Sequence, residues 1–385
     1  MRTPEEFDEI RPYDPEELPA VFEELIADPE FRAVAGLVVP DMPYEEICAR
    51  LRRCRTSLEV QQTFFHPLLH GILDKHSDGL TMECSLITDK RIPHTFITNH
   101  RDIVMDAAFL SISLLDYGFD NTLEIAIGDN LLIRPWIKKL VRVNKSFIVQ
   151  RSAGIRQMLA SSARMSKYMH YAIAVKHENI WIAQREGRAK DSDDRTQDAI
   201  LKMMAMGGEG TVTERLKQLN LVPTALSYEY DPCDYLKAQE FQQKRDIKNF
   251  KKSPADDLAN MQTGIFGYKG RICFRMASPL NDWLDTLPAD MPKTELFTTI
   301  AAHIDREIHR NYQLYPGNYA AADMLNGGHD FAHHYTPEEK ARFEAYLESR
   351  IEKVVVPQPD TAFLRERILT MYANPVFNHI AATRQ

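Results

Sequence analysis

The chain has 385 residues, enough for one large domain with appendages or for two domains. Hydrophobic residues make up 44% and charged residues 26%, which is ordinary for a globular protein with a sizeable core. The net charge is −8, the first thirty residues lack the pattern of a secretory signal, and no apolar run approaches the roughly 20 residues of a membrane span. We therefore expect a cytoplasmic protein or one that sits on a membrane surface.

The predicted elements fall into three regions. Residues 1–78 show apolar spacings of three to four and repeated prolines, which predicts short helices. Residues 79–285 alternate helix-like stretches with short β-like runs, which predicts an α/β domain. The β-like runs read HTFIT, LEIAIG, SFIVQR, IWIAQREG, VPTALSYEY and RICFRM. Residues 286–385 are helical again, and Thr336, Pro337 and Glu339 predict a capped helix start.

The five cysteines are scattered and form no CxxC or Cys/His cluster, so we expect reduced, mostly buried thiols rather than disulfides or a zinc site. The segment GGHDFAHHY (327–335) contains three histidines and an aspartate, but without a second cluster it favours a solvated loop over a metal site.

Charge is distributed unevenly along the chain. Residues 130–177 contain ten Lys/Arg and no Asp or Glu, whereas residues 1–31 contain eleven acids and two arginines. Such a basic stretch in an acidic protein predicts an anionic ligand or surface nearby. Within it, LLIRPWIKKLVRV (131–143) suits either a helix in a lipid headgroup layer or an ordinary amphipathic helix packed on the sheet.

The stretch TNHRDIVMDAAFL (98–110) contains His-Arg-Asp, which also begins a protein-kinase catalytic loop. The kinase interpretation fails because the other kinase motifs are missing and the lysine-bearing strand-like run IAVKHENI follows this stretch. A His beside a carboxylate is instead the minimal device that makes an alcohol nucleophilic. His100 follows a strand-like run, and either Asp102 or Asp106 is placed to partner it.

Three further blocks follow in order: NKSFIVQR (144–151), IWIAQREGRAK (180–190) and LVPTALSYEYDP (221–232). Together with His100 and Asp106, these blocks resemble the glycerolphosphate acyltransferase superfamily, whose members acylate glycerol-3-phosphate, dihydroxyacetone phosphate or 1-acylglycerol-3-phosphate. The resemblance spans residues 87–280 and implies an acyltransferase-like central sheet with flanking helices. The sequence departs from the family pattern in that Asp106 lies one residue late, which leaves Asp102 as the alternative partner, and in that Arg151 is displaced in its block.

The resemblance also implies roles for particular residues. His100 would deprotonate the acceptor hydroxyl, and Asp106 would orient it. Substrate would be held by residues of the stretch 98–110 and of the two blocks that follow it. They are Arg101, Arg151, Arg185, Glu186, Gly187, Arg188 and Lys190. The donor would be acyl-CoA or acyl carrier protein, with no cofactor and no metal.

The acceptor implied is glycerol-3-phosphate or a lysophospholipid, used in phospholipid synthesis at the inner face of a membrane with an anionic surface; no nucleic acid is expected. Two alternatives stay open. One is the same chemistry on another acceptor, such as an acylated amino acid in aminolipid synthesis. The other is a catalytically silent lipid-binding scaffold.

Overall fold

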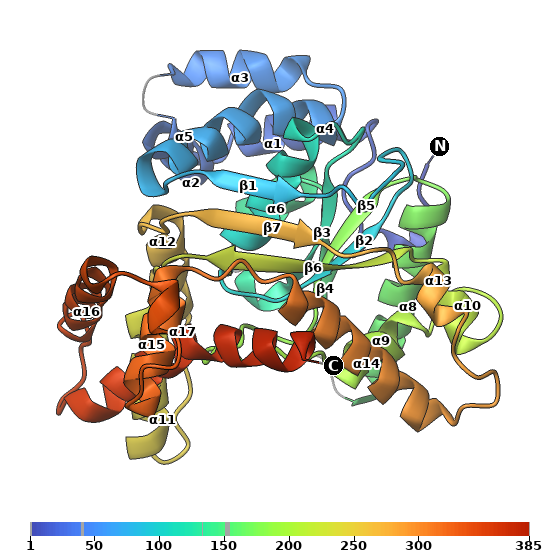
Figure 1. Cartoon of the computed structure of the whole chain (residues 1–385). Coiled ribbons are helices and arrows are strands. Elements are labelled where there is room, and N and C mark those ends of the chain that lie inside the picture. The colour runs from blue at the N-terminus through green and yellow to red at the C-terminus, as the bar shows by residue number, and fades with distance from the viewer. Residues whose placement is uncertain (1, 40–41, 133, 151–154, 385) are drawn as a thin grey trace.

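The computed structural model describes residues 2–39, 42–132, 134–150 and 155–384. Helices from η1 to α5 precede the sheet in the chain, and α1 to α5 lie in the upper part of Figure 1. They are η1 (Glu5–Phe7), α1 (Leu18–Ile26), α2 (Pro29–Val38), α3 (Tyr44–Arg53), α4 (Ser57–Val60), the π-helical turn η2 (Gln61–Phe65) and α5 (His66–His76).

The described residues form one seven-stranded sheet in the order β1-β7-β6-β2-β5-β3-β4. The strands are β1 (Leu80–Glu83), β2 (Thr95–Thr98), β3 (Leu123–Gly128), β4 (Ser146–Val149), β5 (Asn179–Ala183), β6 (Leu221–Tyr228) and β7 (Ile272–Met276). All neighbouring pairs are parallel except β6 and β7. The predicted α/β class is confirmed, and six of the strands match the β-like runs; β1 was not predicted.

Helices connect the strands and then continue to the C-terminus (Figure 1). Between strands lie α6 (Met105–Asp116), η3 (Asp129–Leu131), α7 (Pro135–Val143), α8 (Ile155–Ala174), α9 (Asp198–Met204), α10 (Val212–Lys217), α11 (Asp234–Asp246) and α12 (Pro254–Phe266). After β7 come α13 (Asn281–Leu284), α14 (Lys293–Arg310), α15 (Pro316–Asn326), η4 (Ala332–His334), α16 (Pro337–Ile351) and α17 (Thr361–Thr383). The predicted capping box at Thr336 is present.

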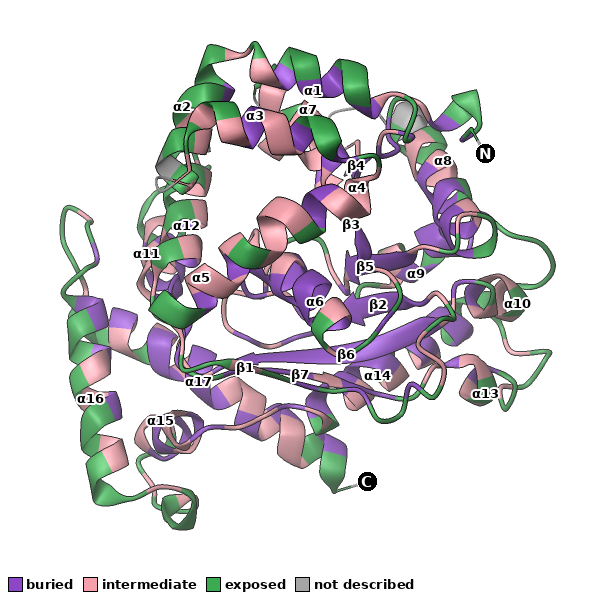
Figure 2. Ribbon diagram, turned by 90° about the horizontal axis from the view of Figure 1, so that it is seen from above, coloured by how far each residue is buried: buried purple, intermediate pink, exposed green. Residues whose placement is uncertain are grey.

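Both faces of the sheet are buried, as the colouring of the central strands in Figure 2 shows. Successive residues of a strand point to opposite faces. On β2, Phe96 belongs to the core that includes residues of α5 and α6, and Ile97 belongs to the core that includes residues of α8, α9 and α14. The second of these cores also contains Phe7 and Ile10. The N-terminal segment therefore packs directly against the core of the sheet.

Two further features bear on the expectations from sequence. All five cysteines are free and buried. In the part of the chain that the structure describes, no helix is both long enough and apolar enough to span a bilayer.

Candidate active site

His100 lies at the carboxyl end of the central strand β2, between the parallel strands β5 and β6. The side-chain amide of Asn99 joins β2 to β6, because it donates to the carbonyl of Leu226 at 2.9 Å and accepts from its N–H at 2.8 Å. From β2 the chain continues to β3 on the β5 side, whereas from β6 it continues to β7 on the other side. Ligands of open α/β sheets bind where neighbouring connections diverge in this way, so the fold itself marks this edge as a candidate site.

His100 contacts Asp106. The imidazole Nδ1 lies 2.7 Å from the Oδ2 of Asp106, and the two side chains are 12% and 1% exposed. Because an ionised carboxylate only accepts hydrogen bonds, the contact holds the proton on Nδ1 and leaves Nε2 as the basic nitrogen. The ring of Trp181 stands edge-on to the imidazole, with centroids 5.4 Å apart, and limits how the ring can turn. This is the geometry of a base and its orienting carboxylate.

The turn between β2 and α6 wraps around the Asp106 carboxylate, which lies in the first turn of α6. Its oxygens accept from the N–H of Arg101 at 2.6 Å and the N–H of Asp102 at 3.0 Å. The hydroxyl of Tyr228, at the end of β6, donates to Oδ1 at 3.0 Å. The turn therefore brings the Asp106 carboxylate, six residues after His100 in sequence, into contact with the imidazole.

Asp102 has a different position. Its Oδ1 accepts from the N–H groups of Val104 and Met105 at 2.9 and 2.8 Å, so it caps the start of α6. Its Oδ2 is buried and has no hydrogen-bond partner among the described residues. Burial, together with the nearby Asp106 carboxylate, raises the pKa of Asp102. A Cβ added to Gly264 of α12 would lie 1.8 Å from this Oδ2, so glycine is required where α12 approaches the turn.

The turn after β5 brings a second group of polar side chains to the same edge of the sheet. Gly187 adopts a φ of +68°, which glycine accommodates without strain. Gln184 is fully buried. Neither the oxygen nor the nitrogen of its side-chain amide has a hydrogen-bond partner in the described chain. The same holds for the buried Nε of Arg185 and NH1 of Arg188, although the NH2 of Arg188 donates to Asn260 at 3.1 Å. Buried polar atoms are rarely left unpaired, so these atoms are candidates for ligand contacts.

Two of the predicted substrate-binding residues have other partners. Arg101 makes a buried, two-pronged ion pair with Asp194, at 2.7 and 2.5 Å. Lys190 is paired with Glu240 of α11, and burial lowers the pKa of this lysine to about 8. Their cationic groups are therefore engaged within the protein.

The other predicted site residues divide as follows. Arg151 lies outside the described residues. Glu186 and Gly187 are exposed in the turn after β5, and the N–H of Glu186 donates to the side chain of Gln197 at 2.8 Å. Arg185 and Arg188 flank that turn.

Three residues of the site were not predicted from sequence: Tyr228, Gln184 and Gly264. Tyr228 and Gln184 each carry a signal, because each is a polar-tipped side chain at the end of an otherwise apolar strand. Gly264 carries none, since its role depends on α12 crossing a turn more than 150 residues away in sequence.

A small cavity lies beside this network. Its volume is about 30 Å³, room for about one water molecule, and it is lined in part by Arg101, Tyr228 and Tyr312. His100 does not line it.

Four cations of the basic stretch pair with acids of the N-terminal segment. Bridges run from Lys139 to Glu24 at 2.8 Å and from Arg164 to Glu9 at 2.8 Å. Longer contacts join Arg134 to Glu30 and Lys167 to Glu6. In α7, Trp136, Leu140 and Val143 pack with the N-terminal helices. Of the two readings of this segment, the structure favours the packed amphipathic helix.

The chain was compared with family models, curated proteins and solved structures. No family model matches the sequence, and no curated protein matches it. Among solved structures, the 1-acyl-sn-glycerophosphate (LPA) acyltransferase PlsC from Thermotoga maritima is similar to this chain, with a TM-score of 0.38 and 10% identity. The match covers 78% of this chain and 100% of that one. A likeness this distant carries no functional argument, and the family resemblance read from the four sequence blocks stays a prediction.

Proposed function

We propose that this protein is an O-acyltransferase that moves a fatty acyl group from a thioester donor, acyl-CoA or acyl carrier protein, to a hydroxyl group of a phosphorylated glycerol or its monoacyl derivative. The observation that carries the proposal is the 2.7 Å contact between His100 and Asp106. It lies at the carboxyl end of β2, where the connections that follow β2 and β6 run in opposite directions. The order of the four sequence blocks supports the same reaction class.

In the proposed reaction, Nε2 of His100 takes the proton of the acceptor hydroxyl as its oxygen attacks the thioester carbonyl. The new C–O bond forms, the C–S bond breaks, and the imidazolium returns its proton to the departing thiolate. Asp106 keeps the imidazole in the required tautomer and stabilises the imidazolium. The products are an ester and a free thiol, so protons and electrons balance without a further reactant.

The acceptor phosphate is assigned to Arg185 and Arg188. Each has a buried guanidinium nitrogen without a hydrogen-bond partner in the described residues, and both flank the turn next to β2. Guanidinium groups bind phosphate through paired, charge-assisted hydrogen bonds. Arg101 and Lys190, which already bind carboxylates, would contribute only to the shape of the site.

The test is release of free thiol from palmitoyl-CoA and from palmitoyl-acyl carrier protein, with glycerol-3-phosphate, 1-acylglycerol-3-phosphate or an N- or O-acylated amino acid as acceptor. We expect turnover with a phosphorylated glycerol, its loss in His100→Ala, and its retention in the control His329→Ala, which changes an exposed histidine. Turnover only with the amino-acid acceptor would identify aminolipid synthesis instead. Absence of turnover with every donor and acceptor would favour the lipid-binding scaffold.

We also propose that the protein works at the inner face of an anionic membrane, as a peripheral protein. Met158 and Leu159 are 49% and 64% exposed in the first turns of α8, which follows β4 at the same edge as His100. Liposome flotation tests this. Leu159→Asp should weaken binding to anionic vesicles, whereas Val355→Asp, at an 80% exposed position before α17, should not. Equal, salt-insensitive binding to neutral and anionic vesicles would contradict the proposal.

A further inference from the structure

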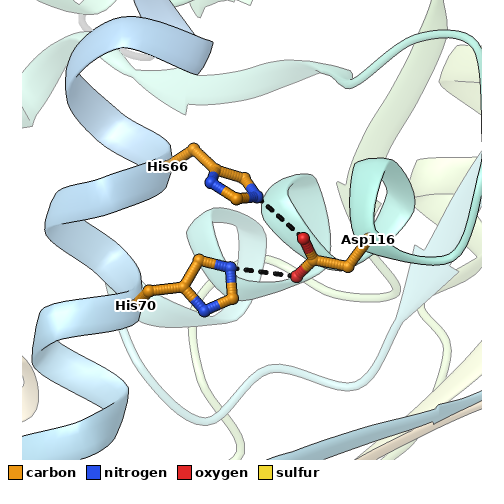
Figure 3. Close-up of side chains that lie close together, drawn as sticks. All are labelled: His66, His70 and Asp116. Atoms are coloured by element: carbon orange, nitrogen blue, oxygen red, sulfur yellow. Dashed lines mark hydrogen bonds and ion pairs between the residues drawn. The ribbon is translucent and has the colours of Figure 1, made fainter.

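Three side chains outside the candidate active site converge between α5 and α6 (Figure 3). The Nε2 of His66 lies 2.7 Å from one oxygen of Asp116, and the Nε2 of His70 lies 3.1 Å from the other. The centroids of the two imidazole rings are 4.4 Å apart. The possible metal-ligand atoms of the three side chains all lie within 4.8 Å of one another. Among the described residues, no other group of three His, Cys, Asp or Glu side chains is found to meet this condition.

The local structure explains why these groups meet. His66 and His70 are four residues apart, so they lie on one face of α5, one turn apart. The π-helical turn Gln61–Phe65 directly precedes His66, and π turns occur frequently at functional sites. Asp116 is the last residue of α6, and α5 and α6 share a hydrophobic core through Leu69 and Leu73.

Hydrogen bonding within the cluster is incomplete. The Nε2 of His70 is buried and has no hydrogen bond to any described residue, although it lies close to Asp116. One carboxylate thus faces two imidazoles, of which His66 alone makes a hydrogen bond to it. A cation between the three groups would use both nitrogen lone pairs and the carboxylate charge at once.

We propose that His66, His70 and Asp116 bind a divalent transition-metal ion of the zinc class. Imidazole nitrogen and carboxylate oxygen are ligands that suit Zn²⁺, with bonds of about 2.0–2.2 Å. A tetrahedral ion would set its ligand atoms roughly 3.3 Å apart, which small side-chain rotations reach from the present separations. The side chains are 31–40% exposed, so water can reach a fourth position.

The ion fixes the N-terminal helices to the helix that carries Asp106. Asp106 and Asp116 lie ten residues apart on α6, about 15 Å along its axis, so the metal contacts neither the His100 imidazole nor a substrate held there. The metal site is therefore independent of the proposed acyl transfer, and the two proposals are tested separately.

The experiment is calorimetric titration of the full-length, chelator-treated protein with Zn²⁺, together with thermal unfolding with and without the ion. We expect one ion per chain and a rise in Tm of several degrees at saturation. His70→Asn and Asp116→Asn should each weaken binding at least about tenfold and remove the rise in Tm. The control, a triple Asn variant of His329, His333 and His334, should bind as the wild type does.

Binding that survives both cluster variants, or that the loop variant abolishes, would overturn the assignment, as would absence of binding to the wild type. Co²⁺ provides a readout that does not depend on stability. The wild type should develop the visible absorption of tetrahedral Co²⁺, and folded His70→Asn should not. If a variant fails to fold, His66→Gln replaces it, and the Co²⁺ spectrum of the remaining folded variants decides.

Discussion

Asp106→Asn tests whether the carboxylate of Asp106, rather than that of Asp102, supports His100. An amide at position 106 can still accept from the Arg101 and Asp102 N–H groups, so the β2–α6 turn should keep its shape. What it loses is the negative charge beside the imidazolium. Two unit charges about 4 Å apart attract by about 4 kcal/mol at an effective dielectric constant of 20. We therefore expect kcat to fall by at least about 100-fold and up to about 1,000-fold, with little change in KM.

The matched variant is Asp102→Asn. Its remaining oxygen can still cap α6 through Val104 and Met105, and asparagine is as good a cap as aspartate. We expect kcat to fall by less than about tenfold. The assay is thiol release under saturating donor and acceptor, with Tm measured for each variant to confirm folding. A loss at position 102 that equals or exceeds the loss at position 106, in folded proteins, would refute this assignment.

Three other substitutions test neighbouring parts of the structure. Tyr228→Phe removes one hydrogen bond to the Asp106 carboxylate and should lower kcat by about 3- to 30-fold and lower Tm as well; a fully active variant would contradict that contact. Gly264→Ala should cost about 1–3 kcal/mol of unfolding free energy because its Cβ meets Asp102, whereas Gly36→Ala has open space, so equal denaturation midpoints would refute the clash. Burial raises the pKa of Asp305 to about 6, so its penalty is complete above pH 6 and is relieved as the pH falls toward 4. Asp305→Asn should therefore stabilise the fold by roughly 1–3 kcal/mol at pH 7 but not at pH 4, and a pH-independent difference would count against this cause.

The sequence was most informative about the strands and the order of the polar blocks. Apolar runs of four to eight residues predicted every strand from β2 to β7, because both faces of each are buried. Strand β1 (Leu80–Glu83) escaped because it is short and mostly exposed, with only Met82 buried. The pairing of His100 with Asp106 was favoured from the sequence, but only the backbone of the intervening turn shows why Asp102 points elsewhere.

Side-chain partners were far less predictable. Arg101 and Asp194 are 93 residues apart, and Lys190 and Glu240 are 50 apart. Motif spacing predicts that a cationic side chain lies near a site. It does not predict whether a carboxylate from a distant helix or loop pairs with that cation. The His66, His70 and Asp116 cluster was missed for the same reason, since its third member comes from another helix.

Ion pairs within the chain account for part of the uneven charge distribution. Acid-free residues 130–177 suggested an anionic ligand, yet several of their cations pair with the acids of the N-terminal segment. Ion pairs of this kind are exposed and individually weak. Arg185 and Arg188 lie outside this stretch, and each keeps a buried nitrogen without a partner in the described chain. Each such nitrogen costs about 1–3 kcal/mol, which a bound phosphate would offset. Unmet hydrogen-bonding capacity, rather than charge density, is therefore the observation on which the proposed phosphate contacts of Arg185 and Arg188 rest.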